Sequence, residues 1–377
     1  MSEPTDVHAM FPHAPGRTGM YESFYLRAVA PDRPLGVWIR YTAHKNRARP
    51  PVPARGSVWC TVFDGADARP FMHKLTSDAL SVPDGAWIAV GDSQLGPERA
   101  EGACGEARWS LSFASEETEL RHLPHALLYR APLPRTKLTS PAPAARFEGV
   151  LELRSAALDT APLTAAESAV SPPSASALAA RRIELDGWRG MVGHNWGAQH
   201  AERWIWLHGV GFEEEPEAWI DVAIGRLRVA GRTTPWVANG ALHIDGERHR
   251  LGGVGARGLL VAERPERCVL SLPGAGGLTV EAHVQAPPAA LAGWRYADPG
   301  GSHRGGGHGD RHHKDPSTPP AESHQHDVSN CSIAALALTV RRPGRPARTL
   351  RTAHGAAYEL GMRERDHGVP IAPFADG

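Results

Sequence analysis

The sequence of 377 residues lacks an excess of charge of either sign. Lysine and arginine total 41, and aspartate and glutamate also total 41, so no overall field attracts a polyanion or an acidic membrane surface. We therefore expect no nucleic acid among the partners. The sequence also lacks a run of about 18 apolar residues, the length that a transmembrane helix needs. Residues 1–11 contain no basic segment followed by an apolar one, so the expected location is cytoplasmic.

Cysteine is scarce and widely spaced. No C-x-x-C pair occurs, which argues against a zinc knuckle or a redox motif. We predict that the cysteines are reduced residues of the core, and the sequence predicts neither a metal site nor another cofactor. The four cysteines are Cys60, Cys104, Cys268 and Cys331.

Long stretches with helical periodicity are also missing. Glycine (40 residues) and proline (33 residues) interrupt nearly every pattern before a helix could develop. Between these breaks lie short segments rich in β-branched and aromatic residues, such as 21–28, 36–42 and 57–63 in the first half and 204–209 and 219–229 in the second. Short β-rich segments separated by frequent glycine and proline predict a mainly β protein with little helix.

The chain length and a change in composition predict two domains. Residues 155–180 are rich in alanine, serine and proline, which indicates a connection between domains 1–154 and 181–377. Each half contains a strand that begins Trp-Ile, at Trp38 and at Trp204, which favours duplication of one barrel-like unit.

Residues 300–327 hold six histidines among glycine, proline, serine and charged residues. A histidine-rich tract can bind divalent metal, but without a fixed spacing we predict a mobile, solvated loop. The six are His303, His308, His312, His313, His324 and His326.

Six of the eleven tryptophans fall between residues 188 and 236. Such a cluster forms either a dense core or the wall of a ligand cavity. If residues 200–208 are a strand, one face mixes rings with titratable groups, which favours a cavity lining over an aliphatic core, with a surface or interdomain face as the alternative. That face consists of His200, Glu202, Trp204, Trp206 and His208.

Asp221 shares a strand face with Trp219, where an aromatic interior would raise the pKa of its carboxyl and make it a general acid. The alternative is an ion pair with Arg226 or Arg228. His194 and His200 are six residues apart, a spacing that does not predict a metal pair.

Segments 21–28, 38–42 and 193–204 resemble the tocopherol cyclase, carotenoid hydratase and AttH-like superfamily, with Asn195-Trp196-Gly197 as a specific neighbourhood. The resemblance implies two lipocalin-like antiparallel β-barrels, one in each predicted domain. It further implies a pocket for an isoprenoid- or polyketide-like ligand, in which relatives protonate an alkene or cyclise a chain without a cofactor.

The resulting hypothesis is cofactor-independent, acid-catalysed hydration, cyclisation or isomerisation of a small apolar ligand. Asp221 and Glu202 are the predicted acids. A non-catalytic lipocalin-like carrier and a lipid-linked stress or assembly protein are the alternatives. The predicted ligand-binding residues are His194, Asn195, Trp196, His200, Trp204, Trp206, His208 and Trp219.

Overall fold

The computed structural model describes residues 7–14, 19–48, 50–154, 180–229, 231–253, 255–299 and 325–374. Antiparallel strands hold 61% of these residues and helix only 4%, which confirms the predicted mainly β fold. Within them, no helix is long and apolar enough to cross a membrane. The helical turns are η1 (Phe11–His13), α1 (Leu127–Arg130), η2 (Ala275–Gly277) and η3 (Pro288–Ala290).

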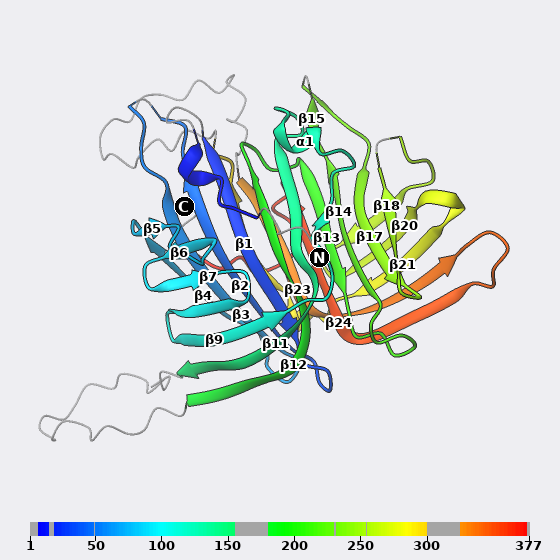
Figure 1. Cartoon of the computed structure of the whole chain (residues 1–377), viewed down its shortest axis with the longest axis horizontal. Helices are drawn as coiled ribbons and strands as arrows, with labels where there is room; N and C mark the ends of the chain where they lie inside the picture. The colour runs from blue at the N-terminus through cyan, green and yellow to red at the C-terminus, as the bar shows by residue number, and fades with distance from the viewer. Residues whose placement is uncertain are drawn as a thin grey trace, which may run out of the picture.

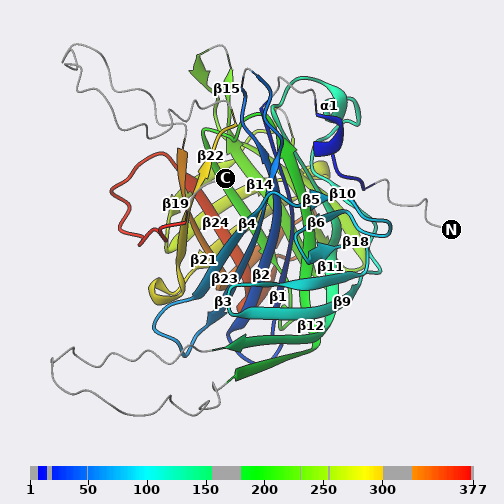
Figure 2. The same cartoon turned by 90° about the vertical axis from the view of Figure 1, so that its left-hand side faces the viewer.

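The first sheet is a nearly closed antiparallel barrel (Figure 1, blue through cyan to the green of β11 and β12). Its path runs β4-β3-β2-β1-β12-β11-β9-β8-β7-β6-β5, with β10 paired to β11. Because β6 contacts both β2 and β3, the path curls back on itself (Figure 2). The strands are β1 (Met20–Val29), β2 (Leu35–Lys45), β3 (Arg55–Asp64), β4 (Phe71–Ser77), β5 (Leu80–Ser81), β6 (Ile88–Val90), β7 (Ser93–Leu95), β8 (Arg99–Cys104), β9 (Ala107–Ala114), β10 (Leu120–Arg121), β11 (Thr136–Arg154) and β12 (Ala180–Gly197).

The second sheet runs β18-β17-β14-β13-β24-β23-β21-β20-β19, with β22 paired to β23. A separate ribbon consists of β15 (Arg228–Val229) and β16 (Arg232–Thr233). The strands of the second sheet are β13 (Arg203–Gly209), β14 (Trp219–Arg226), β17 (Val237–Ile244), β18 (Glu247–Gly252), β19 (Leu260–Arg264), β20 (Arg267–Pro273), β21 (Thr279–Gln285), β22 (Ala292–Ala297), β23 (Gln325–Arg341) and β24 (Arg348–Met362).

The strand order of the first sheet repeats in the second. In each, a four-strand meander ends beside a long hairpin, β11–β12 or β23–β24, which then continues into the remaining strands. This repeat agrees with a duplicated unit, but the two Trp-Ile strands do not correspond. Trp38 lies on β2, whose counterpart is β14, whereas Trp204 lies on β13, the counterpart of β1.

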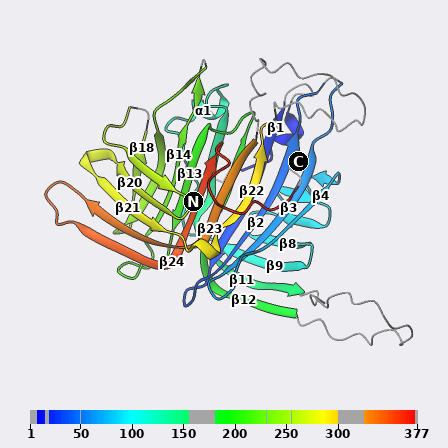
Figure 3. The ribbon, with the colours of Figure 1, turned by 180° about the vertical axis from the view of Figure 1, so that it is seen from behind.

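The two sheets pack against each other through aromatic side chains. Strand β23 contacts β2 and β3, as the view from behind shows (Figure 3). Trp38 of β2 stacks on Trp294 of β22 with ring centroids 4.8 Å apart, and Trp59 of β3 meets the edge of Tyr296 at 6.2 Å. These residues belong to one buried cluster that contains most of the second sheet's core. The junction is therefore packed like a domain interior.

A charged group is also buried at this junction. Arg27 of β1 is fully buried and donates from Nη1 to His208 Nδ1 at 3.1 Å and from Nη2 to the Ser332 carbonyl at 2.9 Å. Burial lowers the pKa of Arg27 to about 9. Burial, with the Arg27 charge, also lowers the pKa of His208 to about 4, so the ring is neutral at pH 7 and can accept this hydrogen bond.

Two boundaries predicted from the sequence differ from the strand boundaries in the structure. Strand β12 pairs with β1 and β11, so residues 181–197 complete the first sheet although the prediction counted them with the second half. The division into domains itself stays a prediction. Residues 155–179 and 300–324 lie outside the described residues, but the predicted loop end at 327 is wrong, because Gln325, His326 and Asp327 already belong to β23. All four cysteines are buried and free, as predicted.

Glycine makes room for the indole of Trp204 beside the junction. Trp204 of β13 lies between Gly225 of β14 and Gly361 of β24 in the sheet register. A Cβ atom on Gly361 would come within 2.1 Å of the Trp204 indole, whereas one on Gly225 would make only ordinary contacts, the nearest at 3.5 Å to Ala201. The indole therefore rests on the bare backbone of β24.

We expect Gly361→Ala to displace the Trp204 ring and to lower the free energy of unfolding by about 1–3 kcal/mol, as overpacking does. Gly225→Ala is the matched control, and we expect its stability to equal or slightly exceed that of the wild type. Near-ultraviolet circular dichroism reports the ring position, and denaturant unfolding reports the stability. Wild-type values for both variants would contradict the close packing of Trp204 on Gly361.

Candidate functional site

A cavity of about 420 Å³ lies where the two sheets meet. The first sheet contributes residues of β1, β2, β11 and β12, together with residues of the 122–135 connection, and the second sheet contributes residues of β13, β14, β17, β22 and β24. Its aromatic wall comprises Tyr21, Tyr25, Trp38, Trp204, Trp206 and Tyr296. Its polar groups include Arg40, His122, Asn195, His200, Asn239 and Glu359.

Glu359 of β24 places a carboxyl in this aromatic wall. Trp204 Nε1 donates to its Oε1 at 2.9 Å, and Asn330 Nδ2 donates to its Oε2 at 3.1 Å. Burial raises the pKa of Glu359, and these two donors together with the Arg40 charge only partly oppose the rise. Glu359 therefore holds its proton more readily than an exposed glutamate does.

Arg40 supplies a cation in the same cavity. Its guanidinium lies 4.1 Å from the centre of the Tyr296 ring, and its Nε donates to Ser23 Oγ at 2.6 Å. Both contacts fix the side chain in place. The cavity thus joins a large apolar surface to a carboxyl and a guanidinium, which suits an apolar ligand with one polar end.

Asp221 is fully buried behind this wall and is not among the lining residues. Ser140 donates to its Oδ2 at 2.5 Å, and Trp206 Nε1 donates to its Oδ1 at 3.1 Å. Burial alone would raise the pKa of Asp221, but the nearby His122 and the hydrogen bonds outweigh it and lower the pKa. The expected raised pKa is therefore wrong, and the partner is His122 in place of Arg226 or Arg228.

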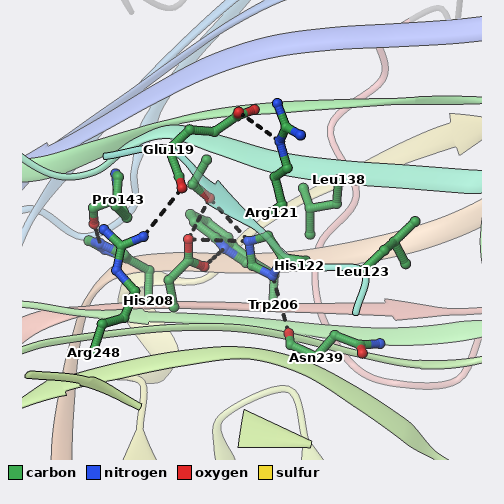
Figure 4. A network of polar contacts seen from close by, with 12 residues as sticks. Glu119, Arg121, His122, Leu123, Leu138, Pro143, Trp206, His208, Asn239 and Arg248 are labelled. Carbon is green, nitrogen blue, oxygen red and sulfur yellow. Dashed lines mark hydrogen bonds and ion pairs between the residues drawn. The ribbon is translucent and has the colours of Figure 1, made fainter. Parts of the chain in front are cut away.

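His122 follows β10 of the first sheet and reaches across to the second (Figure 4). Its Nδ1 lies 3.1 Å from the carbonyl oxygen of Asn239 on β17, and its Nε2 lies 3.4 Å from Asp221 Oδ2 and 3.1 Å from Ser140 Oγ. Both ring nitrogens face oxygen atoms that can accept a proton. This imidazole lines the cavity, with the Asp221 carboxylate behind it.

Glu202 and Glu22 also lie outside the cavity lining. Glu202 Oε1 pairs with Arg363 Nε at 2.9 Å. Glu22 is fully buried and accepts hydrogen bonds from the backbone amides of Met10 and Phe11, while His194 Nε2 lies 2.7 Å from its Oε1. Both carboxylates therefore have partners in the structure and do not face a ligand.

Four of the predicted ligand-binding residues, Asn195, His200, Trp204 and Trp206, line the cavity. The other four lie elsewhere. His194 pairs with Glu22, Trp196 packs near Tyr129, His208 bonds Arg27, and Trp219 stacks on His243.

The strand assumed for residues 200–208 begins at Arg203. His200 and Glu202 consequently belong to the connection between β12 and β13, where period-two alternation does not apply. Trp204 and Trp206, which are on β13, do share the cavity side.

Sequence reasoning missed Glu359 and His122. Glu359 stands in an otherwise uncharged segment, 356–362, and nothing local marks it as facing an aromatic wall. Its partners Trp204 and Asn330 are 155 and 29 residues away. Trp38 and Arg40 carried a signal, since one strand face there combines a large ring with a charge.

Comparison with known proteins finds relatives in Mycobacterium tuberculosis. The chain is 25% identical over 283 residues to an uncharacterized protein found in two strains, covering 69% of this chain and 77% of the relative. No family model matches the sequence.

Among solved structures, CghA in complex with Sch210972 has a TM-score of 0.50 at 14% identity and covers 91% of this chain and 88% of its own. An AttH-like protein of Nitrosomonas europaea has a TM-score of 0.48 at 12% identity, with 96% of each chain covered. Kievitone hydratase from Nectria haematococca has a TM-score of 0.44 at 8% identity and covers 94% of this chain and 93% of its own. The resemblance expected from the sequence is confirmed at the level of the fold.

We expect Asp221→Asn to lower the free energy of unfolding by about 3 kcal/mol at pH 7, because it removes a buried carboxylate that accepts hydrogen bonds from Ser140 and Trp206 and faces the His122 ring. Since the pKa of Asp221 is lowered in the folded state, its stabilising effect is complete above the ordinary value of 3.8 and is lost as the pH falls through the folded-state pKa. The gap between wild type and variant should therefore narrow below about pH 4.

Denaturant unfolding at a series of pH values measures this gap. Asp245→Asn is the control, because Asp245 is partly exposed in its ion pairs with Arg342 and Arg348 and should contribute at most about 1 kcal/mol. Equal stability losses for the two variants at pH 7 would contradict the network around Asp221.

Proposed function

We propose that this chain, which has the fold of the tocopherol cyclase, carotenoid hydratase and AttH-like superfamily, is a cofactor-independent acid catalyst. Its substrate is a small, unsaturated, largely apolar molecule of isoprenoid or polyketide type. The reaction is hydration, cyclisation or isomerisation, and Glu359 is the acid. The observation that carries the proposal is the raised pKa of a carboxyl in an aromatic-lined cavity.

The size and lining of the cavity support this substrate class. A volume of about 420 Å³ falls in the range of roughly 300 to 1,000 Å³ that is usual for small-molecule sites. Tyr25, Trp204 and Tyr296 supply ring faces, and Arg40 suits an oxygen atom at the polar end of the ligand. Such a ligand enters with its apolar body against the rings.

Glu359 would donate its proton to one carbon of an alkene, so the π bond breaks, a C–H bond forms and the neighbouring carbon becomes cationic. Aromatic faces stabilise that cation through their electron-rich π systems. In hydration, a water oxygen then bonds to the cation and the surplus water proton returns to the Glu359 carboxylate. In cyclisation, a second alkene of the same ligand attacks the cation, and loss of a proton to Glu359 completes the reaction.

Asp221 and Glu202, the acids expected from the sequence, have other roles in this proposal. Asp221 positions His122 from behind the cavity wall, since its pKa is lowered and it remains a carboxylate. Glu202 is held by Arg363 outside the lining. A protonated carboxyl is needed to donate, and Glu359 meets that need best.

The first experiment identifies the ligand. We expect mass spectrometry of a solvent extract, taken from protein purified from its native host, to find an unsaturated apolar molecule of the size of the cavity. The same extraction applied to a Trp204→Ala variant is the control, because loss of the wall should release the ligand. An equal yield from both proteins would contradict binding in this cavity.

The second experiment tests the acid with the ligand so identified. We expect Glu359→Gln to reduce turnover by at least about a hundredfold while affinity, read from tryptophan fluorescence, changes by less than about tenfold. Activity of the wild type should fall as the pH rises through the raised pKa of Glu359. Glu202→Gln is the matched control and should retain both turnover and affinity.

Two outcomes would decide against this assignment. Turnover that persists in Glu359→Gln would exclude Glu359 as the acid. Binding without any turnover in the wild type would identify the protein as a lipocalin-like carrier.

A further inference from the structure

Beside the cavity, three metal-binding residue types meet from distant parts of the chain. His200 lies in the connection between β12 and β13, Asp298 directly follows β22, and His326 is the second residue of β23. Strands β22 and β23 lie side by side (Figure 3). They are antiparallel, with Tyr296 opposite His326, so Asp298 and His326 are held at the same end of this pair.

The donor atoms of these residues are close enough to share one ion. One ligand atom from each of His200, Asp298 and His326 lies within 4.8 Å of the others. Asp298 is buried and accepts from the His200 backbone amide at 2.7 Å, and His200 Nδ1 lies 2.9 Å from the same oxygen. Tyr21 stacks on the His200 ring at 4.0 Å, which fixes its plane.

His326 has no hydrogen-bond partner among the described residues. It is 0% exposed, and neither Nδ1 nor Nε2 makes a hydrogen bond within the part of the chain that the structure describes. Two unpaired ring nitrogens in the interior are costly, because each has lost its hydrogen bond to water. The other two members of the group, His200 and Asp298, already contact each other. His326 is therefore the member whose ring nitrogens still need a partner among the described residues.

We propose that His200, Asp298 and His326 bind a divalent transition-metal ion, with Zn²⁺ as the expected occupant. Two imidazole nitrogens and one carboxylate are a ligand set of known zinc sites that leave a fourth position open. The metal gives the buried His326 ring a partner. Two arginines lie near enough for their charges to act on His326. Each is already paired with a carboxylate, Arg363 with Glu202 and Arg365 with Asp327, which offsets their repulsion of a bound cation.

The site adjoins the cavity through His200, which belongs to both. The His326 ring also packs at 5.1 Å from the indole of Trp204. A metal bound here therefore stabilises the position of Trp204 in the aromatic wall of the cavity. The inference does not depend on the proposed reaction, because a carrier needs the same wall.

The test must separate this site from the histidine-rich tract. Five further histidines stand in the sequence between Asp298 and His326, at positions 303, 308, 312, 313 and 324. Such a tract binds divalent metal through its composition alone. The experiment therefore uses the full chain with these five histidines replaced by asparagine as the parent protein.

We expect the chelator-treated parent, after dialysis against Zn²⁺, to retain about one zinc per chain by elemental mass spectrometry. In the parent background, His326→Phe and Asp298→Asn should each weaken Zn²⁺ binding by at least about a hundredfold, more than loss of an outer-shell partner costs. Zn²⁺ should raise the melting temperature of the parent and leave that of His326→Phe unchanged.

Two controls make the result specific. His326→Phe keeps an aromatic ring against Trp204, so its circular dichroism and metal-free melting temperature should match those of the parent. His283→Asn removes an exposed histidine of β21 and should leave Zn²⁺ binding unchanged. If His326→Phe fails to fold, Asp298→Asn gives the same reading, and Co²⁺ added to the parent should give the visible absorption bands of a nitrogen- and oxygen-ligated ion.

Absence of bound Zn²⁺ in the parent would overturn the proposal. So would a parent and a His326→Phe variant that bind Zn²⁺ with equal affinity, because the ion would then lie elsewhere.

Discussion

Burial of Arg27 between the two sheets is the constraint on which the rest of the structure depends. Burying a guanidinium is costly unless its donors find acceptors, and here Nη1 and Nη2 find the His208 ring and the Ser332 carbonyl of the second sheet, while Nε has no hydrogen-bond partner among the described residues. His208 can accept only while it is neutral, and burial beside Arg27 keeps it neutral. These contacts set the position of β1 against β13 and β23. Strands β1 and β13 also carry residues that line the cavity, so the spacing of these two strands there follows from this contact.

The junction also gives two carboxyl groups opposite properties. Asp221 and Glu359 are both buried, and burial alone raises the pKa of each. Asp221 lies opposite the His122 imidazole and accepts hydrogen bonds from the Ser140 hydroxyl and the Trp206 indole N–H, so its anionic form is stabilised. Glu359 accepts hydrogen bonds from an indole N–H and an amide N–H and feels the charge of Arg40, but burial outweighs these and raises its pKa, so its neutral form is favoured. Acid catalysis uses pairs of groups whose pKa values differ in this way. Here Glu359 keeps its proton, and Asp221 keeps its negative charge.

The sequence predicts the strands better than it predicts the site, for a physical reason. Alternation along one strand is local, so Trp204 and Trp206 could be placed on one side of β13, and that side does line the cavity. The same alternation extends to His208, but β13 continues past the cavity into the junction between the sheets. There Arg27 donates a hydrogen bond to the His208 ring. Glu359 has its partners on other strands, and only the folded sheet brings Trp204 and Asn330 to it.

His200 shows why a short connection matters as much as the strands it joins. Its ring stacks on Tyr21 of the first sheet at 4.0 Å and lies 5.7 Å from Tyr296 of the second, while its backbone and ring both contact Asp298. The residue that joins β12 to β13 is therefore anchored in both halves. His200 lines the cavity, and its Nδ1 also contacts the Asp298 carboxylate that lies beside His326. Any change that moves His200 must consequently alter the cavity wall and the His200, Asp298 and His326 group together, because a single imidazole belongs to both.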